Sequence, residues 1–253
     1  MKNHITCTFI GHATLLLKIG ETTILTDPLF SSKVLFFKRK RELTFDPTKL
    51  PNLSAILISH AHYDHLNTES FKFIKNNIPV ILPEKCSRSI EHLITNPTIE
   101  LSHYASHQLK NGTTITSLPQ KHNGGHFDRI RFYHSNSYII NIDDKTIFFC
   151  ADSSYSHYFK EIGDLYKIDL AILPIGGYSP RFLFKGCHMT PKEAVNAFKD
   201  LKAKNMIPIH WGSFSFSLEG LRDPKKDLER VLDGDKNIAS RIHIIEPGTT
   251  LEL

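Results

Sequence analysis

The sequence predicts an α/β (α+β) protein in which helices cover β-sheets. Short apolar runs rich in β-branched and aromatic residues recur along all 253 residues. Such runs dominate the early part of the chain, whereas later they alternate with helical patterns. Since no Pro-, Gly- or Ser-rich linker, internal repeat or low-complexity tract interrupts the sequence, we expect one domain over residues 1–253.

The expected strands are apolar or alternating runs bounded by turn residues. The first two are separated by a break at Gly11-His12, and the fourth is the apolar run Ala55-Ile56-Leu57-Ile58-Ser59. In chain order, we predict strands over residues 6–10, 14–19, 23–26, 55–59, 80–82, 113–118, 137–142, 146–150, 170–174, 206–209 and 242–245.

The helix that begins at Pro191 has the clearest start signal. Thr190 can cap it, proline suits the first helical position, and Glu193 completes a Thr-x-x-Glu capping box. Asn67 offers a similar cap for a helix that begins at residue 68. In chain order, we predict helices over residues 68–76, 86–94, 156–165, 191–203 and 224–232.

Composition narrows the classes of protein to consider. The 40% hydrophobic content is sufficient for a core, and no run of 18 apolar residues predicts a membrane-spanning helix. The first residues lack the pattern of a signal peptide, and the four cysteines are scattered without a C-x-x-C pair, so we expect a cytoplasmic protein with reduced thiols. The net charge of +5 favours anionic partners weakly and does not indicate nucleic-acid binding.

Four metal-binding side chains lie within the six residues 60–65, directly after the predicted strand 55–59. Imidazole and carboxylate groups are ligands that suit Zn²⁺ and related ions. Residues two apart on an extended chain point the same way, so His60 and His62 can converge on one metal. Asp64 and His65 can then reach a second. Two metals about 3.5–4 Å apart are a known arrangement for hydrolysing phosphate esters.

Three further residues repeat one pattern, a metal-capable side chain at the end of an apolar strand. His122 follows the strand 113–118, Asp152 follows 146–150 and His210 follows 206–209. Loops at strand ends are a usual place for catalytic groups. Each of these residues alone is more often structural, but beside the 60–65 segment they predict the remaining ligands of a two-metal site.

These motifs resemble those of the metallo-β-lactamase superfamily of metal-dependent hydrolases. The similar segments are H-x-H-x-D-H at 60–65, PQKH ending at 122, FFCADS around 152 and PIHWGSF around 210. The opening segments 10–20 and 24–30 are similar to the family's first hairpins. Within the superfamily, residues 148–198 and 203–214 resemble the branch containing N-acyl-phosphatidylethanolamine phospholipase D.

The resemblance implies a four-layer αββα sandwich with two divalent ions at one edge. By this resemblance, His60, His62 and His122 hold the first ion, and Asp64, His65 and His210 hold the second. Asp152 bridges the two, while His12 and Asp27 are expected to support the ligands by hydrogen bonds. Zn²⁺ is the expected metal, with Mn²⁺ or Fe²⁺ as alternatives for the same ligands.

Five neutral histidines and two carboxylates around two divalent ions leave roughly two net positive charges, which favours an anionic substrate. We therefore expect a metal-bound hydroxide to attack a phosphodiester, with Asp64 and Asp152 as catalytic ligands. His188 is expected to contact a phosphate oxygen or protonate a leaving group. Arg181 and Lys185 are further candidates for substrate binding.

Two segments that mix apolar and basic residues, 35–41 and 181–185, suit the surface of an anionic lipid. They equally suit an RNA backbone or ordinary solvated loops. The expected substrate is thus a small anionic molecule or a phospholipid, with peripheral membrane contact and a homo-oligomer both left open. A nucleic-acid substrate is disfavoured because no appended RNA-binding domain is present.

Three other functions remain as alternatives. A sugar-phosphate lactonase would use the same ligands. A di-iron redox protein is disfavoured, because such members resemble one another in having Glu where this chain has His62, and they commonly carry a flavin domain. A metal-free binding protein is disfavoured because all seven ligand positions are filled.

Overall fold

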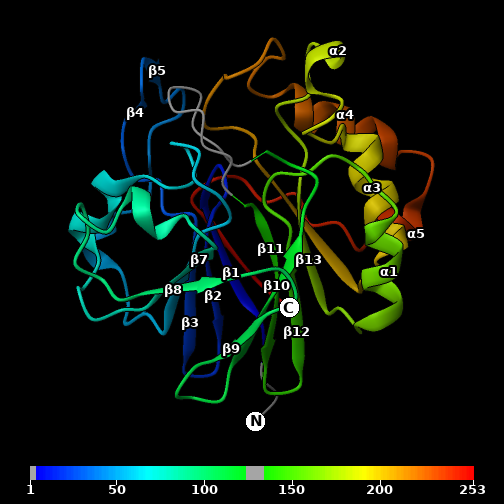
Figure 1. Cartoon of the computed structure of the whole chain (residues 1–253). Helices are drawn as coiled ribbons and strands as arrows, with labels where there is room; N and C mark the ends of the chain where they lie inside the picture. The colour runs from blue at the N-terminus through cyan, green and yellow to red at the C-terminus, as the bar shows by residue number, and fades with distance from the viewer. Residues whose placement is uncertain (1–3, 124–133) are drawn as a thin grey trace.

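A computed structural model describes residues 4–123 and 134–253 of the chain, and it has a four-layer αββα architecture (Figure 1). Two β-sheets form the central layers. The first has seven strands in the order β15-β1-β2-β3-β6-β7-β8. In chain order, these are β1 (Thr6–Gly11), β2 (Thr14–Ile19), β3 (Thr22–Thr26), β6 (Ala55–Leu57), β7 (Val80–Pro83), β8 (Thr98–Leu101) and β15 (Thr249–Glu252).

The second sheet has six strands in the order β14-β13-β12-β11-β10-β9. They are β9 (Ser106–Gln108), β10 (Thr114–Pro119), β11 (Asn136–Ile142), β12 (Lys145–Phe149), β13 (Leu170–Pro174) and β14 (Asn205–Ile209). A separate hairpin pairs β4 (Lys33–Val34) with β5 (Phe37–Lys38). Every residue of β6, β7 and β13 is buried, as expected for parallel strands covered on both faces.

Helices form the outer layers. The α-helices lie on the side of the six-stranded sheet (Figure 1) and comprise α1 (Tyr158–Leu165), α2 (Arg181–Phe184), α3 (Pro191–Asp200), α4 (Asp223–Leu232) and α5 (Lys236–Ala239). Short 3₁₀ helices and loops cover the other sheet: η1 (Pro47–Lys49), η2 (Thr68–Phe73) and η3 (Ser87–Ser89). Phe71 and Ile90 of this layer pack with Ile56, Ile58 and Val80 of the seven-stranded sheet.

The direction of the strands positions the candidate site. β1, β3 and β6 run the same way in the first sheet, because β2 is antiparallel to both β1 and β3, and β3 is parallel to β6. In the second sheet, β10, β12 and β14 also run together. Each of these six strands is followed by one of the predicted site residues. Their carboxyl ends therefore deliver the polar side chains to a common edge.

Several predicted elements need correction. Residues 242–245 form no strand, and Ile242 makes only an isolated bridge to Met206, because the chain leaves this sheet to pair as β15 with β1 in the other sheet. Residues 86–94 contain only η3, and residues 68–76 contain the 3₁₀ helix η2 rather than an α-helix. The sequence analysis also missed the short or exposed elements β4, β5, β8, β9, β15, α2 and α5.

The remaining predicted strands and helices are present, with shifts of a few residues at their ends. The capping box at Thr190 and Glu193 is formed as expected, with both reciprocal hydrogen bonds. No helix within residues 4–123 and 134–253 has the length and apolar character needed to cross a membrane.

Candidate metal centre

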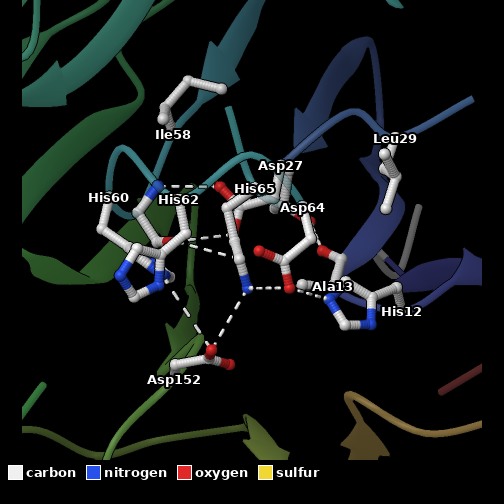
Figure 2. A network of polar contacts seen from close by, with 12 residues as sticks. His12, Ala13, Asp27, Leu29, Ile58, His60, His62, Asp64, His65 and Asp152 are labelled. Carbon is white, nitrogen blue, oxygen red and sulfur yellow. Dashed lines mark hydrogen bonds and ion pairs between the residues drawn. The ribbon is translucent and has the colours of Figure 1, made fainter. Parts of the chain in front are cut away.

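The segment after β6 turns back on itself and brings its ligand-type side chains together. The amides of His65 and Leu66 both donate to the carbonyl of His62, at 3.0 and 2.8 Å. This turn faces the loops that follow β10, β12 and β14. Figure 2 shows His60, His62 and His65 directed toward Asp152, which comes from the opposite sheet.

His60, His62 and His122 form the first group of candidate ligands. Their nearest ring nitrogens all lie within 4.8 Å of one another. His60 Nε2 is 2.9 Å from His62 Nδ1, and His122 Nε2 is 3.2 Å from the same atom. Three imidazole nitrogens this close can face one divalent ion. The structure thus brings together the three residues predicted for the first metal, and the ligand assignment itself stays a prediction.

The second group contains Asp64, His65 and His210, together with His12. Asp64 Oδ2 lies 3.6 Å from His65 Nε2 and 3.9 Å from His210 Nε2. His12 Nε2 is 2.8 Å from the same carboxylate oxygen, so His12 can donate a hydrogen bond that holds Asp64 in place. This contact agrees with the supporting role predicted for His12.

Asp152 lies between the two groups. Its Oδ2 is 3.2 Å from His65 Nε2, 4.0 Å from His60 Nε2 and 3.9 Å from His122 Nε2. Its Oδ1 is 3.3 Å from His210 Nε2. One carboxylate thus faces histidines of both groups, as a bridging ligand must.

Unpaired buried atoms test whether these residues suit a metal. His65 Nε2, His210 Nε2 and Asp152 Oδ1 are buried and have no hydrogen-bond partner among the described residues. Leaving such groups unpaired inside a protein costs roughly 1–3 kcal/mol each. Since the atoms converge and are the donor types preferred by Zn²⁺, divalent cations would satisfy them. The residues therefore fit the metal centre implied by the fold.

Hydrogen bonds behind the site orient its histidines. Asp27 is fully buried and accepts from the Ser59 amide and hydroxyl, at 2.7 and 2.6 Å, while its Oδ2 lies 2.7 Å from His65 Nδ1. Because the one hydroxyl proton of Ser59 goes to Asp27, His60 Nδ1 at 2.9 Å must donate to Ser59. Both histidines then carry a proton on Nδ1 and turn Nε2 toward the centre. Asp27 thus occupies the supporting position predicted for it.

His122 is oriented in the same way from the other side. Its Nδ1 lies 3.0 Å from the carbonyl oxygen of Cys187, to which it can donate. Metal-bound histidines usually have such a second partner, which selects the tautomer. The loop before α3 therefore takes part in shaping the site, a role that the sequence analysis did not foresee for Cys187.

Charge within the cluster separates its histidines into two kinds. Burial lowers the pKa of His12, His62 and His122 to about 4, which keeps them neutral. Burial also acts on His65, but the surrounding carboxylates, Asp152 first among them, raise its pKa well above the usual value. Asp152 similarly raises the pKa of His210. The carboxylates therefore attract positive charge to the positions where the second cation is expected.

Four of the nine non-glycine residues with positive φ in the described parts of the chain lie at this edge. His12, Asp27 and His210 have φ values of 59°, 34° and 61°, and Ala151, just before Asp152, has 54°. Left-handed conformations cost non-glycine residues of order 1–3 kcal/mol and persist where surrounding structure enforces them. The strain lets each side chain turn from its strand into the site.

His188 also faces the cluster. Its Nδ1 is 4.0 Å from Asp152 Oδ2 and has no hydrogen-bond partner among the described residues. Arg181 Nη1 donates to the His188 carbonyl at 2.8 Å, and its Nη2 contacts both carboxylate oxygens of Glu193, at 2.5 and 2.7 Å. Arg181 therefore holds His188 in position, whereas Lys185 is exposed at the end of α2. The substrate-binding roles expected of Arg181 and Lys185 stay predictions.

A small cleft opens beside the second group. Its walls include His12, His210, Phe216 and Glu219. Glu219 accepts hydrogen bonds from three successive amides, those of residues 177, 178 and 179, at 2.6, 3.2 and 3.0 Å. This carboxylate joins the loop after β14 to the loop after β13, so both loops form one wall of the cleft.

Two glycines allow the close packing beneath this wall. A Cβ atom on Gly176 would lie 2.0 Å from the carbonyl oxygen of His210, and one on Gly177 would lie 3.0 Å from His188 Nδ1. The sequence analysis missed both glycines, although a Gly-Gly pair at the end of a strand is a recognisable signal of close backbone approach. It also missed Ser59 and Glu219, whose roles depend on contacts distant in sequence.

The other histidines were expected to be structural or exposed, and within the described residues His4, His92, His103, His107, His134, His157 and His243 belong to none of the metal-type groups. His126 lies outside the described residues.

Comparison with known proteins places these observations in context. A family model described as a beta-lactamase superfamily domain matches residues 22–211. The N-acyl-phosphatidylethanolamine-hydrolyzing phospholipase D 1 of Caenorhabditis elegans is 32% identical over 252 residues, covering 91% of this chain and 70% of that protein. The mitochondrial N-acyl-phosphatidylethanolamine-hydrolyzing phospholipase D of Saccharomyces cerevisiae is 30% identical over 224 residues, covering 83% of this chain and 48% of that protein.

The fold is also similar to that of solved structures. The metallo hydrolase Igni18 of Ignicoccus hospitalis superimposes with a TM-score of 0.75 at 19% identity, over 99% of this chain and 98% of that one. At this identity the likeness concerns the fold alone. The chain spans about half the length of the yeast relative, so the activity of that whole protein is not carried over by similarity.

Proposed function

The chain belongs to the metallo-β-lactamase superfamily and is one of its metal-dependent hydrolases, and we propose that it is a binuclear phosphodiesterase of the N-acyl-phosphatidylethanolamine phospholipase D type. The observation that carries the proposal is the position of Asp152 between two groups of ligand-type side chains. Two divalent ions about 3.5–4 Å apart are an arrangement that suits phosphate-ester hydrolysis. The 32% identity to the worm phospholipase D supports the choice of substrate class.

In this proposal His60, His62 and His122 would hold one ion, Asp64, His65 and His210 would hold the other, and Asp152 would be available to both. Zn²⁺ is the proposed metal, with Mn²⁺ or Fe²⁺ as alternatives for the same ligands. When bound, such ions supply positive charge that polarises a phosphoryl oxygen and lowers the pKa of water toward neutrality.

The chain's own residues then orient the ligand-type side chains and contact the substrate. Asp27 and Ser59 keep the Nε2 atoms of His65 and His60 directed inward, and His12 holds Asp64. His188 turns its Nδ1 into the site, where it can donate a hydrogen bond to a phosphoryl oxygen or to the departing alcohol oxygen. A phosphodiester, with one negative charge and two ester oxygens, offers the acceptor oxygens that this hydrogen bond requires.

The test is product analysis after incubating metal-loaded full-length protein with N-acyl-phosphatidylethanolamine in mixed micelles. Metal-dependent release of phosphatidic acid and N-acylethanolamine is expected, with none from His60→Ala. Lack of release by protein shown to hold two ions would overturn the phospholipase D assignment, and the lactonase alternative would then be tested with sugar-phosphate lactones.

A further inference from the structure

Large apolar side chains are exposed on three segments that are far apart in sequence. The segments are the β4–β5 hairpin, helix α2 and the loop after β14. The exposed fractions are 58% for Leu35, 80% for Phe36, 83% for Phe182, 62% for Leu183 and 80% for Leu218. We call these five residues the apolar rim. They make up most of the large hydrophobic residues exposed in the described parts of the chain.

The apolar rim lies at the entrance to the metal centre. Figure 1 shows the β4–β5 hairpin and α2 at the same end of the molecule. Phe184 of α2 has its ring 5.8 Å from that of His188. The amide of Leu218 donates to the Ser179 carbonyl at 3.0 Å, which joins the third segment to the start of α2.

A row of aromatic rings leads from the rim into the site. The Phe36 ring is 4.5 Å from that of Phe37, which is 5.1 Å from that of Phe216. The Phe216 ring is 5.6 Å from that of His12, beside Asp64. Ring contacts therefore run without a break from the exposed tip of the hairpin to His12, which is buried beside the second group of candidate ligands.

Exposed lysines lie on the same segments. Lys33, Lys38 and Lys40 flank the hairpin tip, and Lys185 follows Phe182 and Leu183 on α2. None of the four forms an ion pair with any described residue. Exposed apolar side chains bordered by unpaired basic groups suit the boundary between acyl chains and anionic headgroups. A protein partner would have to present an acidic surface around an apolar centre. No described feature of this face indicates such a partner.

We propose that the apolar rim docks the protein on the surface of an anionic phospholipid bilayer, with the metal centre facing the headgroups. The side chains of Phe36 and Phe182 enter the acyl-chain boundary, and the lysines contact the phosphates. The identity of the lipid that is cleaved rests on the proposed function, whereas docking itself requires no hydrolysis. Bilayer lipid could then reach the cleft without leaving an apolar environment.

Docking is measured by co-sedimentation of the full-length protein with phosphatidylcholine vesicles, with and without the anionic lipid phosphatidylglycerol. These vesicles contain no N-acyl lipid, so binding is read independently of hydrolysis. We expect stronger binding to the anionic vesicles and weaker binding at high salt. The double variant Phe36→Ser/Phe182→Ser should lower the partition coefficient at least about tenfold. Neutralising Lys38 or Lys185 to Gln should lower it about fivefold each on anionic vesicles.

The matched control is Leu165→Ser, which removes a 76% exposed side chain from α1, outside the rim. It should bind vesicles like the unmodified protein. Unchanged melting temperature and metal content of the Phe36/Phe182 variant would show that its fold and site are intact.

Absence of vesicle binding, or equal binding by the rim variant, would overturn the inference. So would a self-association in lipid-free buffer that the rim variant abolishes, because the rim would then be an interface between copies. If vesicle binding fails while N-acyl lipid in micelles is still hydrolysed, the docking inference falls and the proposed function stands. If the protein binds vesicles but does not hydrolyse N-acyl lipid in micelles, the proposed function is rejected and the docking inference stands.

Discussion

Replacing Asp27 by Asn tests how the site prepares its histidines for a cation. The carboxylate receives three contacts, from the Ser59 amide at 2.7 Å, the Ser59 hydroxyl at 2.6 Å and His65 Nδ1 at 2.7 Å. Asparagine offers only one acceptor oxygen. If that oxygen keeps the Ser59 amide, the asparagine NH₂ group faces His65 Nδ1. His65 must then move its proton to Nε2, the atom that the site directs at the second ion.

The expected loss follows from these contacts. A hydrogen bond to a charged group contributes about 1.5–3 kcal/mol. Loss of a partner that orients a metal-bound histidine typically weakens metal binding about 10–100-fold, or roughly 1.4–2.7 kcal/mol. The free energy of the lost hydrogen bond and the expected loss of metal-binding free energy therefore fall in the same range. We therefore expect Asp27→Asn to weaken binding of the second ion about 10–100-fold and binding of the first ion less, because Asp27 reaches the first group only indirectly, through Ser59 and His60.

The assay is a titration of the metal-stripped full-length protein with Zn²⁺ against a chelator of known affinity, with metal content measured by atomic emission. Asp144→Asn serves as the control, since the Asp144 side chain is 73% exposed and pairs with Lys145 on the surface. Uptake of both ions by Asp27→Asn with unmodified affinities would refute the orienting role of Asp27.

Three further predictions follow from the same geometry. Restoring Zn²⁺ at about 100 times its dissociation constant to metal-stripped protein should stabilise the fold by about 2.7 kcal/mol, seen in calorimetry as a rise of roughly 5–11 °C in melting temperature; no rise would argue against a metal centre. Arg181→Lys replaces the two guanidinium nitrogens that separately reach the Glu193 carboxylate and the His188 carbonyl with one ammonium group, so turnover should fall about 10–100-fold at unchanged metal content. Combining it with His188→Ala should cost little more than His188→Ala alone, and full additivity would contradict the coupling. Gly176→Ala places a methyl group 2.0 Å from the His210 carbonyl and should lower stability by about 1–3 kcal/mol in urea unfolding, whereas Gly186→Ala, with open space around its Cβ, should not.

Much of the fold could be predicted from local patterns. The strand 170–174 and the helix beginning at Pro191 were predictable because a continuous apolar run and a capping box are properties of neighbouring residues. β15 could not be foreseen, since it is an exposed edge strand that exists only through pairing with β1. The false strand at 242–245 has the opposite cause, an apolar run that leaves the sheet almost unpaired.

The candidate site shows the same division. The ligand-type residues His60, His62, Asp64 and His65 were evident in the sequence, because they follow one strand within six positions. Arg181 was singled out from its charge as a substrate-binding candidate. Its actual contacts, with both carboxylate oxygens of Glu193 and with the His188 carbonyl, come from the packing of α2 against the start of α3.

The sequence patterns by themselves predicted the α/β (α+β) class, the residue types of the candidate metal centre and the strands that carry them, because these depend on periodicity and on short spacings. The four-layer αββα arrangement was implied by the family resemblance. Only the tertiary structure decided that Asp152 lies between the two histidine groups, that Ser59 and Asp27 select the histidine tautomers, and that the β4–β5 hairpin and α2 lie at one end of the molecule. These relations join residues from different sheets and loops. The packing of the two sheets face to face sets the distances between such residues, and no local pattern in the chain records them.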